Sequence, residues 1–288
     1  MIKLVASDMD GTLLGPDGRI SERTAETVRT LQNQGIRFVV CTGRAYEDAV
    51  EPLAERGLIC DTICMNGSAV YDQEGLCIEK RELKHALVEF ILECSQGEWG
   101  DVFFDFMTNH GSYTLTTKEQ FAMYTEQGIV QAMSGTVDFV EMFKRFRPVS
   151  REELFAEDVE IYKVSVFHPS PFVLERIREN LRGDSHLAVA ASHHTNLEIT
   201  ESGAQKGLAL VKFAQMQGIR ACEIMAIGDS DNDLSMLNLP LGYTVAMGNA
   251  MESVKKVARC QTRSNAEDGA AYAMETLVLS ATAVEQVS

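Results

Sequence analysis

The chain has 288 residues, 45% of them hydrophobic, so it can bury a sizeable core in one large or two modest domains. Its formal net charge of −16 opposes non-specific binding to nucleic acid or to an anionic membrane. No apolar segment reaches the roughly 20 residues that span a bilayer, and the first residues do not resemble a signal peptide, so we expect a cytoplasmic protein. Seven cysteines without Cys-x-x-Cys spacing predict reduced thiols, mostly in the core.

The first predicted element is a buried strand at residues 2–6, and two carboxylates, Asp8 and Asp10, follow it directly. In an extended chain residues i and i+2 point to the same side, so we expect both side chains to emerge together beyond the strand. Open α/β sheets bind ligands at such strand ends. Two neighbouring carboxylates repel each other, so a hard divalent cation, Mg²⁺ above all, is the expected partner.

Strands alternate with helices toward both ends of the chain. The predicted strands are residues 36–41, 62–65, 224–227 and 243–246, and the predicted helices near the amino end are 22–34 and 46–56. Alternation of this kind implies right-handed crossovers and a parallel sheet. We therefore expect an α/β fold with a Rossmann-like, doubly wound parallel core.

The middle of the chain has a different pattern, with its strands and helices grouped. Helices are predicted near 83–96 and 171–182, and strands at 102–106, 113–117, 159–167 and 187–199. This grouping predicts a separate α+β unit inserted into the core. The expected domains are residues 1–82 with 193–288 for the core, and 83–192 for the insertion.

A second acidic segment, residues 228–233, follows the strand predicted at 224–227. Asp229 would lie at the strand end, with Asn232 and Asp233 in the first helical turn. This loop can complete a magnesium site with the first acidic strand end. Taken by itself, the segment is equally well explained as a helix N-cap with solvated acids.

Two further segments carry groups that suit a phosphoryl ligand. Thr42 and Gly43, followed by Arg44, offer a hydroxyl and an accessible amide, although such a sequence after a strand is usually an ordinary turn. Lys206 lies in a glycine-flanked segment before a helix predicted at 208–217. A lysine there is usually solvated, but a phosphoryl group beside an attacking carboxylate requires a compensating cation.

These segments together resemble the haloacid dehalogenase superfamily of phosphohydrolases, and within it the Cof-type enzymes with a large α/β cap. The four motifs, in chain order, are Asp8-x-Asp10-Gly11-Thr12, Thr42-Gly43-Arg44, Lys206 and Gly228-Asp229-x-x-Asn232-Asp233. The secondary matches are Asn66-Gly67, Leu197-Glu198-Ile199, residues 246–250 and Asn265-x-Glu267-Asp268-Gly269. The resemblance covers nearly the whole chain and implies that the insertion is a cap domain.

The resemblance also implies a mechanism. Asp8 would be the nucleophile that forms an aspartyl-phosphate, Asp10 the general acid and base, and Lys206 the cation that neutralises Asp8 and the transferring group. Members that drive ion transport carry threonine at the position of Asp10. An aspartate there therefore indicates a phosphatase or a phosphomutase.

The remaining site residues come from the same resemblance. Mg²⁺ would be held by the Asp8 carboxylate, the Asp10 backbone carbonyl and Asp229. Phosphoryl oxygens would be bound by the Met9 amide, Thr42, Gly43, Lys206 and Asn232. Asp233 would orient Lys206 or a metal-bound water.

The expected function is a magnesium-dependent phosphatase of small phosphorylated metabolites, most often sugar phosphates, acting as a monomer or homodimer. A sugar phosphomutase and a non-catalytic phosphometabolite sensor are the alternatives. Substrate contacts are expected from the cap, where the candidates are Asp105, Asn109, His110, Lys163 and His168. His193 and His194 are adjacent on a predicted strand and would point to opposite faces, which argues against a histidine metal site.

Overall fold

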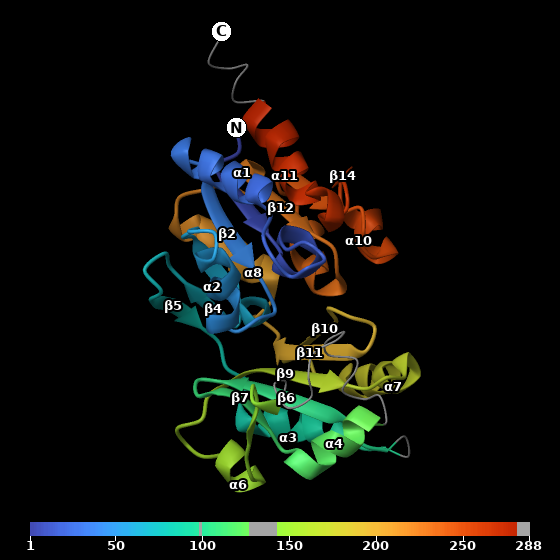
Figure 1. The fold of residues 1–288 in the computed structure, drawn as a ribbon. Helices are drawn as coiled ribbons and strands as arrows, with labels where there is room; N and C mark the ends of the chain where they lie inside the picture. Colours follow the sequence, from blue (N-terminus) through green and yellow to red (C-terminus); the bar gives the residue numbers. More distant parts are fainter. Residues whose placement is uncertain (98–99, 127–142, 281–288) are drawn as a thin grey trace. The chain divides into compact units, whose positions relative to one another are not determined.

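The computed structural model describes residues 1–97, 100–126 and 143–280 (Figure 1). The described chain forms two compact units, one from Met1–Lys80 and Gln205–Ser288 and the other from Arg81–Ala204. The second boundary therefore follows Ala204, whereas the sequence pattern suggested residue 192. The reason is that strand β11 (Asn196–Glu201) pairs with the strands of the inserted unit.

The first unit is built on an eight-stranded sheet of order β14-β13-β12-β1-β2-β3-β4-β5. The strands are β1 (Leu4–Ser7), β2 (Arg37–Cys41), β3 (Asp61–Cys64), β4 (Ala69–Tyr71), β5 (Cys77–Lys80), β12 (Ile224–Gly228), β13 (Tyr243–Ala246) and β14 (Cys260–Gln261). All pairs from β14 to β3 are parallel, and β4 and β5 add an antiparallel edge that the sequence analysis missed. The order reverses between β1 and β12. A doubly wound sheet places its ligand site at this point.

Six α-helices lie in the described part of this unit. They are α1 (Glu22–Asn33), α2 (Tyr46–Ala54), α8 (Lys206–Met216), α9 (Leu234–Leu237), α10 (Glu252–Val257) and α11 (Gly269–Met274). Of these, α1, α2, α9 and α10 connect successive parallel strands of the sheet. The Ser21 side chain caps α1 by accepting a hydrogen bond from the Thr24 amide. α1 packs against α11, and α8 packs against α9. The fold confirms the predicted Rossmann-like, doubly wound core.

The second unit contains a six-stranded sheet of order β10-β11-β9-β6-β7-β8. Its remaining strands are β6 (Phe103–Thr108), β7 (Gly111–Thr114), β8 (Arg147–Pro148), β9 (Ile161–Phe167) and β10 (Leu187–Ala190). Its described helices are α3 (His85–Cys94), α4 (Lys118–Glu126), α6 (Arg151–Leu154) and α7 (Pro171–Leu181). The sheet is antiparallel apart from the β7–β8 pair, which confirms the predicted α+β insertion.

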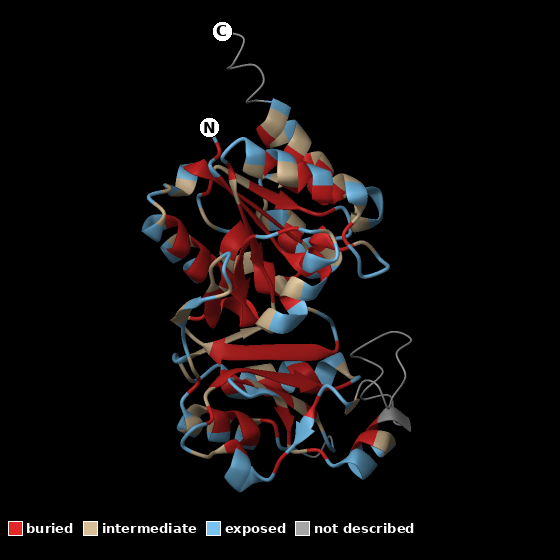
Figure 2. Ribbon diagram, turned by 60° about the vertical axis from the view of Figure 1, so that its left-hand side comes forward, coloured by how far each residue is buried: buried red, intermediate tan, exposed pale blue. Residues whose placement is uncertain are grey.

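Every residue of β9 is buried (Figure 2). Val164 and Val166 belong to a core with side chains from α3 and α7. Phe167 belongs to a second, aromatic cluster with Phe103 and Phe121. The region predicted as one strand at 187–199 is a hairpin, in which β10 and β11 pair in antiparallel fashion.

Two expectations from the sequence concern the burial of the cysteines and the presence of membrane-spanning segments. All seven cysteines are free, but only Cys41, Cys60 and Cys64 are buried, so the expectation that most lie in the core was wrong. Cys41 and Cys64 lie in central strands, whereas exposed Cys77 lies in the edge strand β5. Within the described ranges, no helix combines the length and the apolar character needed to cross a membrane.

Candidate active site

The acidic strand ends meet where the strand order reverses. Asp8 directly follows β1 and Asp229 directly follows β12, and these strands pair in parallel with Ser7 opposite Ile227. The Asp8 amide donates to the Ile227 carbonyl at 2.9 Å, which continues the ladder to the end of the strand. Segments more than 200 residues apart therefore deliver two carboxylates to one crevice.

Lys206 is the cation of this crevice. It is the first residue of α8 and is fully buried. Its Nζ donates to Asp8 Oδ1 at 2.6 Å and to Asp233 Oδ1 at 2.8 Å. Burial alone would lower the pKa of Lys206, but the charges of Asp233 and Asp8 outweigh it and raise that pKa. The residue is therefore held as an ammonium ion, and the solvated alternative is wrong.

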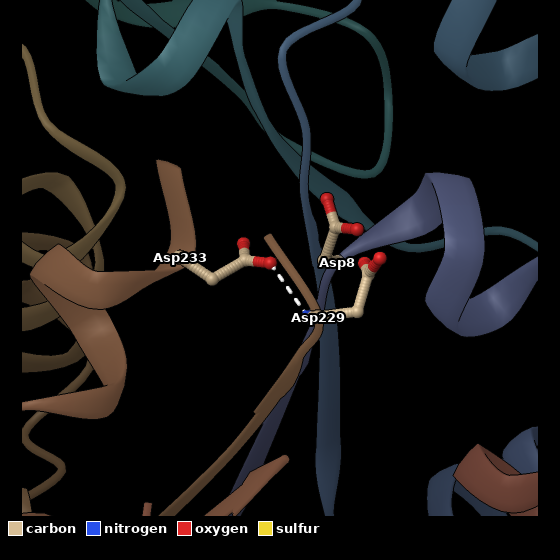
Figure 3. A group of neighbouring side chains, drawn as sticks. All are labelled: Asp8, Asp229 and Asp233. Atoms are coloured by element: carbon tan, nitrogen blue, oxygen red, sulfur yellow. Dashed lines mark hydrogen bonds between the residues drawn. The ribbon is translucent and has the colours of Figure 1, made fainter. Parts of the chain in front are cut away.

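Asp233 connects this lysine to the loop after β12. Its Oδ2 accepts from the Asp229 amide at 2.8 Å (Figure 3) and from the Ser230 amide at 3.0 Å. A fully buried carboxylate with two backbone donors and one ammonium donor is well satisfied. Asp233 thus fixes both the ammonium group of Lys206 and the backbone that carries Asp229.

Asp8, Asp229 and Asp233 form a compact acidic group whose ligand oxygens lie within 4.8 Å of one another. Burial, the charge of Asp233 and that of Asp229 raise the pKa of Asp8, against the opposing effect of Lys206. Burial and Asp233 likewise raise the pKa of Asp229 to about 6. Lys206 is in contact with only two of the three carboxylates. A donor set of hard carboxylate oxygens with excess negative charge fits a divalent metal ion.

The turn after β1 shapes the space beside Asp229. Gly11 has a φ of +75°, and a Cβ added there would lie 2.5 Å from Asp229 Oδ2. The Thr12 hydroxyl donates to Asp229 Oδ1 at 3.0 Å, and Asn249 Nδ2 donates to the Gly11 carbonyl at 2.8 Å. This turn therefore needs glycine at position 11 and a hydroxyl at position 12.

Asp10 does not pair with Asp8, contrary to the expectation from strand alternation. The strand ends at Ser7, and the chain then turns, with Gly11 at a φ of +75° and the Leu14 amide donating to the Met9 carbonyl at 2.9 Å, so the i, i+2 rule no longer applies. The exposed Asp10 carboxylate instead accepts from Arg44, with Nη2 at 2.6 Å and Nε at 2.8 Å. The third carboxylate of the acidic group is Asp233.

Thr42 and Asn232 are both buried and are linked through one residue, Asn66. The Asn66 amide donates to the Thr42 carbonyl at 3.0 Å. The Asn66 Oδ1 accepts from Asn232 Nδ2 at 3.4 Å. The Thr42 hydroxyl accepts from the Arg44 amide at 3.1 Å, which closes the turn that contains Gly43. Two of the predicted phosphate-binding segments are therefore joined.

Two of the cap candidates lie at buried positions on the sheet of the second unit. Lys163 forms an ion pair of 3.1 Å with Glu198, which the sequence analysis named as part of a secondary motif match but not as a site residue. The signal was the alternation of polar and apolar residues in β11, which puts Glu198 on the same side as Asn196 and Thr200. Asp105 and Glu198 both pair with Ser165 in the register of β9. Polar groups therefore line the middle of this sheet face.

The other cap candidates bond to neighbouring backbone or side-chain groups. Asn109 Nδ2 donates to the Asp158 carbonyl at 3.0 Å, and its Oδ1 accepts from the Glu160 amide at 2.8 Å. The His110 ring lies 3.5 Å from an Asp158 oxygen. Asn109 and His110 therefore serve the turn between β6 and β7, and their geometry gives no support to a substrate role.

The other three histidines considered in the sequence analysis lie outside helices and strands. His168 Nδ1 accepts from the Ser170 amide at 3.0 Å. His193 and His194 lie between β10 and β11 with ring centroids 4.0 Å apart, so their placement on a strand was wrong. The Asn196 side chain accepts from the His193 amide at 3.0 Å and holds the chain in this turn.

A doubly wound core with a lysine-paired carboxylate and two more carboxylates at its switch point defines an α/β phosphohydrolase. The chain belongs to the haloacid dehalogenase-like hydrolases, whose family model matches residues 5–274. It is 30% identical to the 5-amino-6-(5-phospho-D-ribitylamino)uracil phosphatase YwtE of Bacillus subtilis, over 96% of this chain and 98% of that one. It is 29% identical to an HMP-PP phosphatase of Serratia proteamaculans, over 89% and 88% of the two chains.

A solved structure agrees with these relatives. A haloacid dehalogenase-like hydrolase from B. subtilis superposes with a TM-score of 0.83 at 29% identity, covering 96% of this chain and all of that one. Family, fold and relatives together identify the chain as a phosphatase, that is, a phosphoric monoester hydrolase.

Proposed function

We propose that this protein is a magnesium-dependent phosphatase that acts on small phosphorylated metabolites, sugar phosphates foremost, through a phosphorylated Asp8. The observation that carries the proposal is the contact of the buried Lys206 ammonium with Asp8 at 2.6 Å, next to Asp229 and Asp233. A carboxylate attacks phosphorus only when it is ionised, and the lysine stabilises that form.

The proposed reaction has two steps. An oxygen of Asp8 attacks the phosphorus and the ester oxygen leaves, taking a proton from Asp10. Water then loses a proton to Asp10 and attacks the phosphorus, which releases inorganic phosphate and regenerates the Asp8 carboxylate. Arg44 contacts both oxygens of the Asp10 carboxylate and so orients its ionised form, which is the base of the second step.

The acidic group is the proposed magnesium site. The Asp8 carboxylate, the Asp229 carboxylate and the Asp10 backbone carbonyl would hold the ion. When bound, the ion would supply charge neutralisation at the phosphoryl oxygens. Asp233 keeps Lys206 and the amides of residues 229 and 230 in place, as its hydrogen bonds indicate.

The phosphoryl group itself would be bound by uncharged donors as well as by Lys206. The proposed donors are the Met9 amide, the Thr42 hydroxyl, the Gly43 amide and the Asn232 carboxamide. Thr42 and Asn232 are both buried, so their hydrogen bonds to phosphate would form with little competition from water.

We further propose that the inserted unit determines which phosphate ester is accepted. This proposal is supported by the buried ion pair of Lys163 and Glu198 and by Asp105, which lies on the same face of the sheet. The relatives named above act on a phosphoribityl compound and on HMP-PP, and both belong in the substrate panel.

The test is phosphate release from a panel of sugar phosphates, phosphorylated cofactors and the relatives' substrates, with Mg²⁺ present or chelated. The Asp8→Asn variant is the blank. Magnesium-dependent release that this substitution abolishes supports the proposal, and the ranking of rates identifies the substrate class. Release equal to the blank for every compound overturns it.

A further inference from the structure

The turn formed by Met65, Asn66 and Gly67 carries the clearest feature that the proposed mechanism leaves unused. It connects β3 to β4 and is completely buried. Met65 and Asn66 both have left-handed backbone angles, with φ of +49° and +58°. Among the described residues that are not glycine, Asp268 alone shares this property. Side chains disfavour this region, so the turn is maintained by its surroundings.

The backbone of the turn holds the segment that contains Thr42. The Met65 amide donates to the Arg44 carbonyl at 2.9 Å, and the Asn66 amide donates to the Thr42 carbonyl at 3.0 Å. The left-handed angle of Met65 turns the next amide, that of Asn66, toward the same loop that the Met65 amide contacts. The loop between β2 and α2 is therefore fixed at both ends of Gly43.

The same turn touches the start of α8. Gly67 has a φ of +102°, and a Cβ added there would lie 2.7 Å from the Gln205 carbonyl oxygen. Gln205 is the residue before Lys206 and occupies the N-cap position of α8. The close approach of Gly67 thus sets the position at which the catalytic lysine enters the site.

The side chain of Asn66 contacts Asn232, in the segment that follows β12. Its Oδ1 accepts from Asn232 Nδ2 at 3.4 Å, and both residues are buried. A buried carboxamide with one N–H directed to a fixed acceptor has its other N–H directed by the planarity of the group. Asn66 therefore determines where the second Asn232 donor points.

We infer that Asn66 is a positioning residue. It joins the loop between β2 and α2, which contains Thr42, to Asn232, and so preforms the site for the phosphoryl group. This inference rests on the proposed function, because it takes Thr42 and Asn232 as phosphate ligands. It adds a specific role for Asn66, which acts through these two residues and need not touch the substrate.

The decisive variant is Asn66→Gly, which keeps the left-handed backbone and both amide bonds but removes the bond to Asn232. We expect kcat/KM and the inhibition constant of inorganic phosphate to worsen together by about five- to thirty-fold, with Tm within about 4 °C of wild type. Asn66→Ala should lose Tm as well, because alanine disfavours the backbone angle. The control Asp268→Gly removes a side chain at a left-handed position outside the turn and should leave phosphate affinity unchanged.

A double-mutant cycle separates positioning from general damage. Adding Asn66→Gly to Asn232→Ala should cause little further loss, because the two substitutions remove the same interaction. Losses that multiply, or wild-type phosphate affinity in Asn66→Gly, overturn the inference while leaving the phosphatase intact. A wild-type protein that neither releases nor binds phosphate overturns the proposed function itself, and this inference with it.

Discussion

Arg44 donates to both oxygens of the Asp10 carboxylate, from Nη2 at 2.6 Å and from Nε at 2.8 Å. Its third nitrogen, Nη1, donates to the Asp48 carbonyl at 3.0 Å. The guanidinium is thereby fixed to the first turn of α2 and fixes Asp10 in turn. A two-pronged contact of this kind sets direction as well as charge. Asp10 is the proposed proton donor, so its orientation relative to the leaving group depends on Arg44.

Arg44→Lys should therefore lower kcat by about tenfold for alkyl phosphates, because lysine keeps the charge but not the two-pronged geometry. Aryl phosphates such as p-nitrophenyl phosphate need little protonation and should lose less. The measurement is kcat for both substrate types in wild type and variant. Equal losses for the two types would contradict a role for Arg44 in proton transfer.

Lys206→Met should destabilise the metal-free protein by about 3–5 kcal/mol, because two buried carboxylates lose their shared ammonium partner. Asp233→Asn in the same background should restore part of that loss. Urea unfolding measures both effects. Lys212→Met is the matched control on the same helix, since Lys212 is half exposed in its pair with Glu79 and should cost less than about 1 kcal/mol. A similar loss of unfolding free energy at both positions would show that the buried carboxylates do not depend on the charge of Lys206.

Asp229→Asn should stabilise the metal-free protein at neutral pH, by on the order of 1 kcal/mol. The folded-state pKa of Asp229 is raised to about 6, above the ordinary value near 3.9 for an unfolded aspartate. Its contribution to stability is therefore fully present below about pH 4 and is lost as the pH rises through about 6. Chelated wild type should lose stability across this window, and the variant should lose less.

Magnesium should reverse this difference. A cation bound by the ionised carboxylates raises Tm of wild type at pH 7, and Asp229→Asn should lose most of that rise. Thermal melts with and without Mg²⁺ at pH 4 and pH 7 provide the test. Asp231→Asn, in the same loop, is the control and should behave as wild type. An unchanged magnesium response in Asp229→Asn would remove Asp229 from the proposed metal site.

The sequence pattern was sufficient for the parallel core and for bringing Asp8 and Asp229 together. Strand alternation and the rule that parallel strands share a carboxyl edge fix these two positions. The direction of Asp10 could not be predicted, because the strand ends at Ser7 and a turn with a left-handed Gly11 replaces the strand geometry. The burial of Lys206 depends on the residue at which α8 begins. Sequence pattern locates a helix start only to within about two residues, so this burial could not be predicted.

The cap was harder to predict from the sequence for a related reason. Turns without glycine or proline give little signal, so the chain reversal at His193 and His194 was taken for continuous strand, and the domain boundary was placed too early. The left-handed angles of Met65 and Asn66 occur together with bonds to the carbonyls of Arg44 and Thr42. Contacts of this kind exist only once the chain has folded.

Gly11→Ala should impair the metal site through a clash at a single atom. A Cβ at this position would lie 2.5 Å from Asp229 Oδ2, so the carboxylate must move away from the acidic group. We expect the Mg²⁺ concentration for half-maximal activity to rise at least about tenfold, equivalent to roughly 1.4 kcal/mol of binding. Gly18→Ala is the matched control, because Gly18 has the same φ of +75° but no atom within 4 Å of the added Cβ. It should show only the backbone cost of about 1 kcal/mol in unfolding, with magnesium activation unchanged. If both variants need the same Mg²⁺ concentration, backbone strain explains the effect of Gly11→Ala and the contact with Asp229 does not.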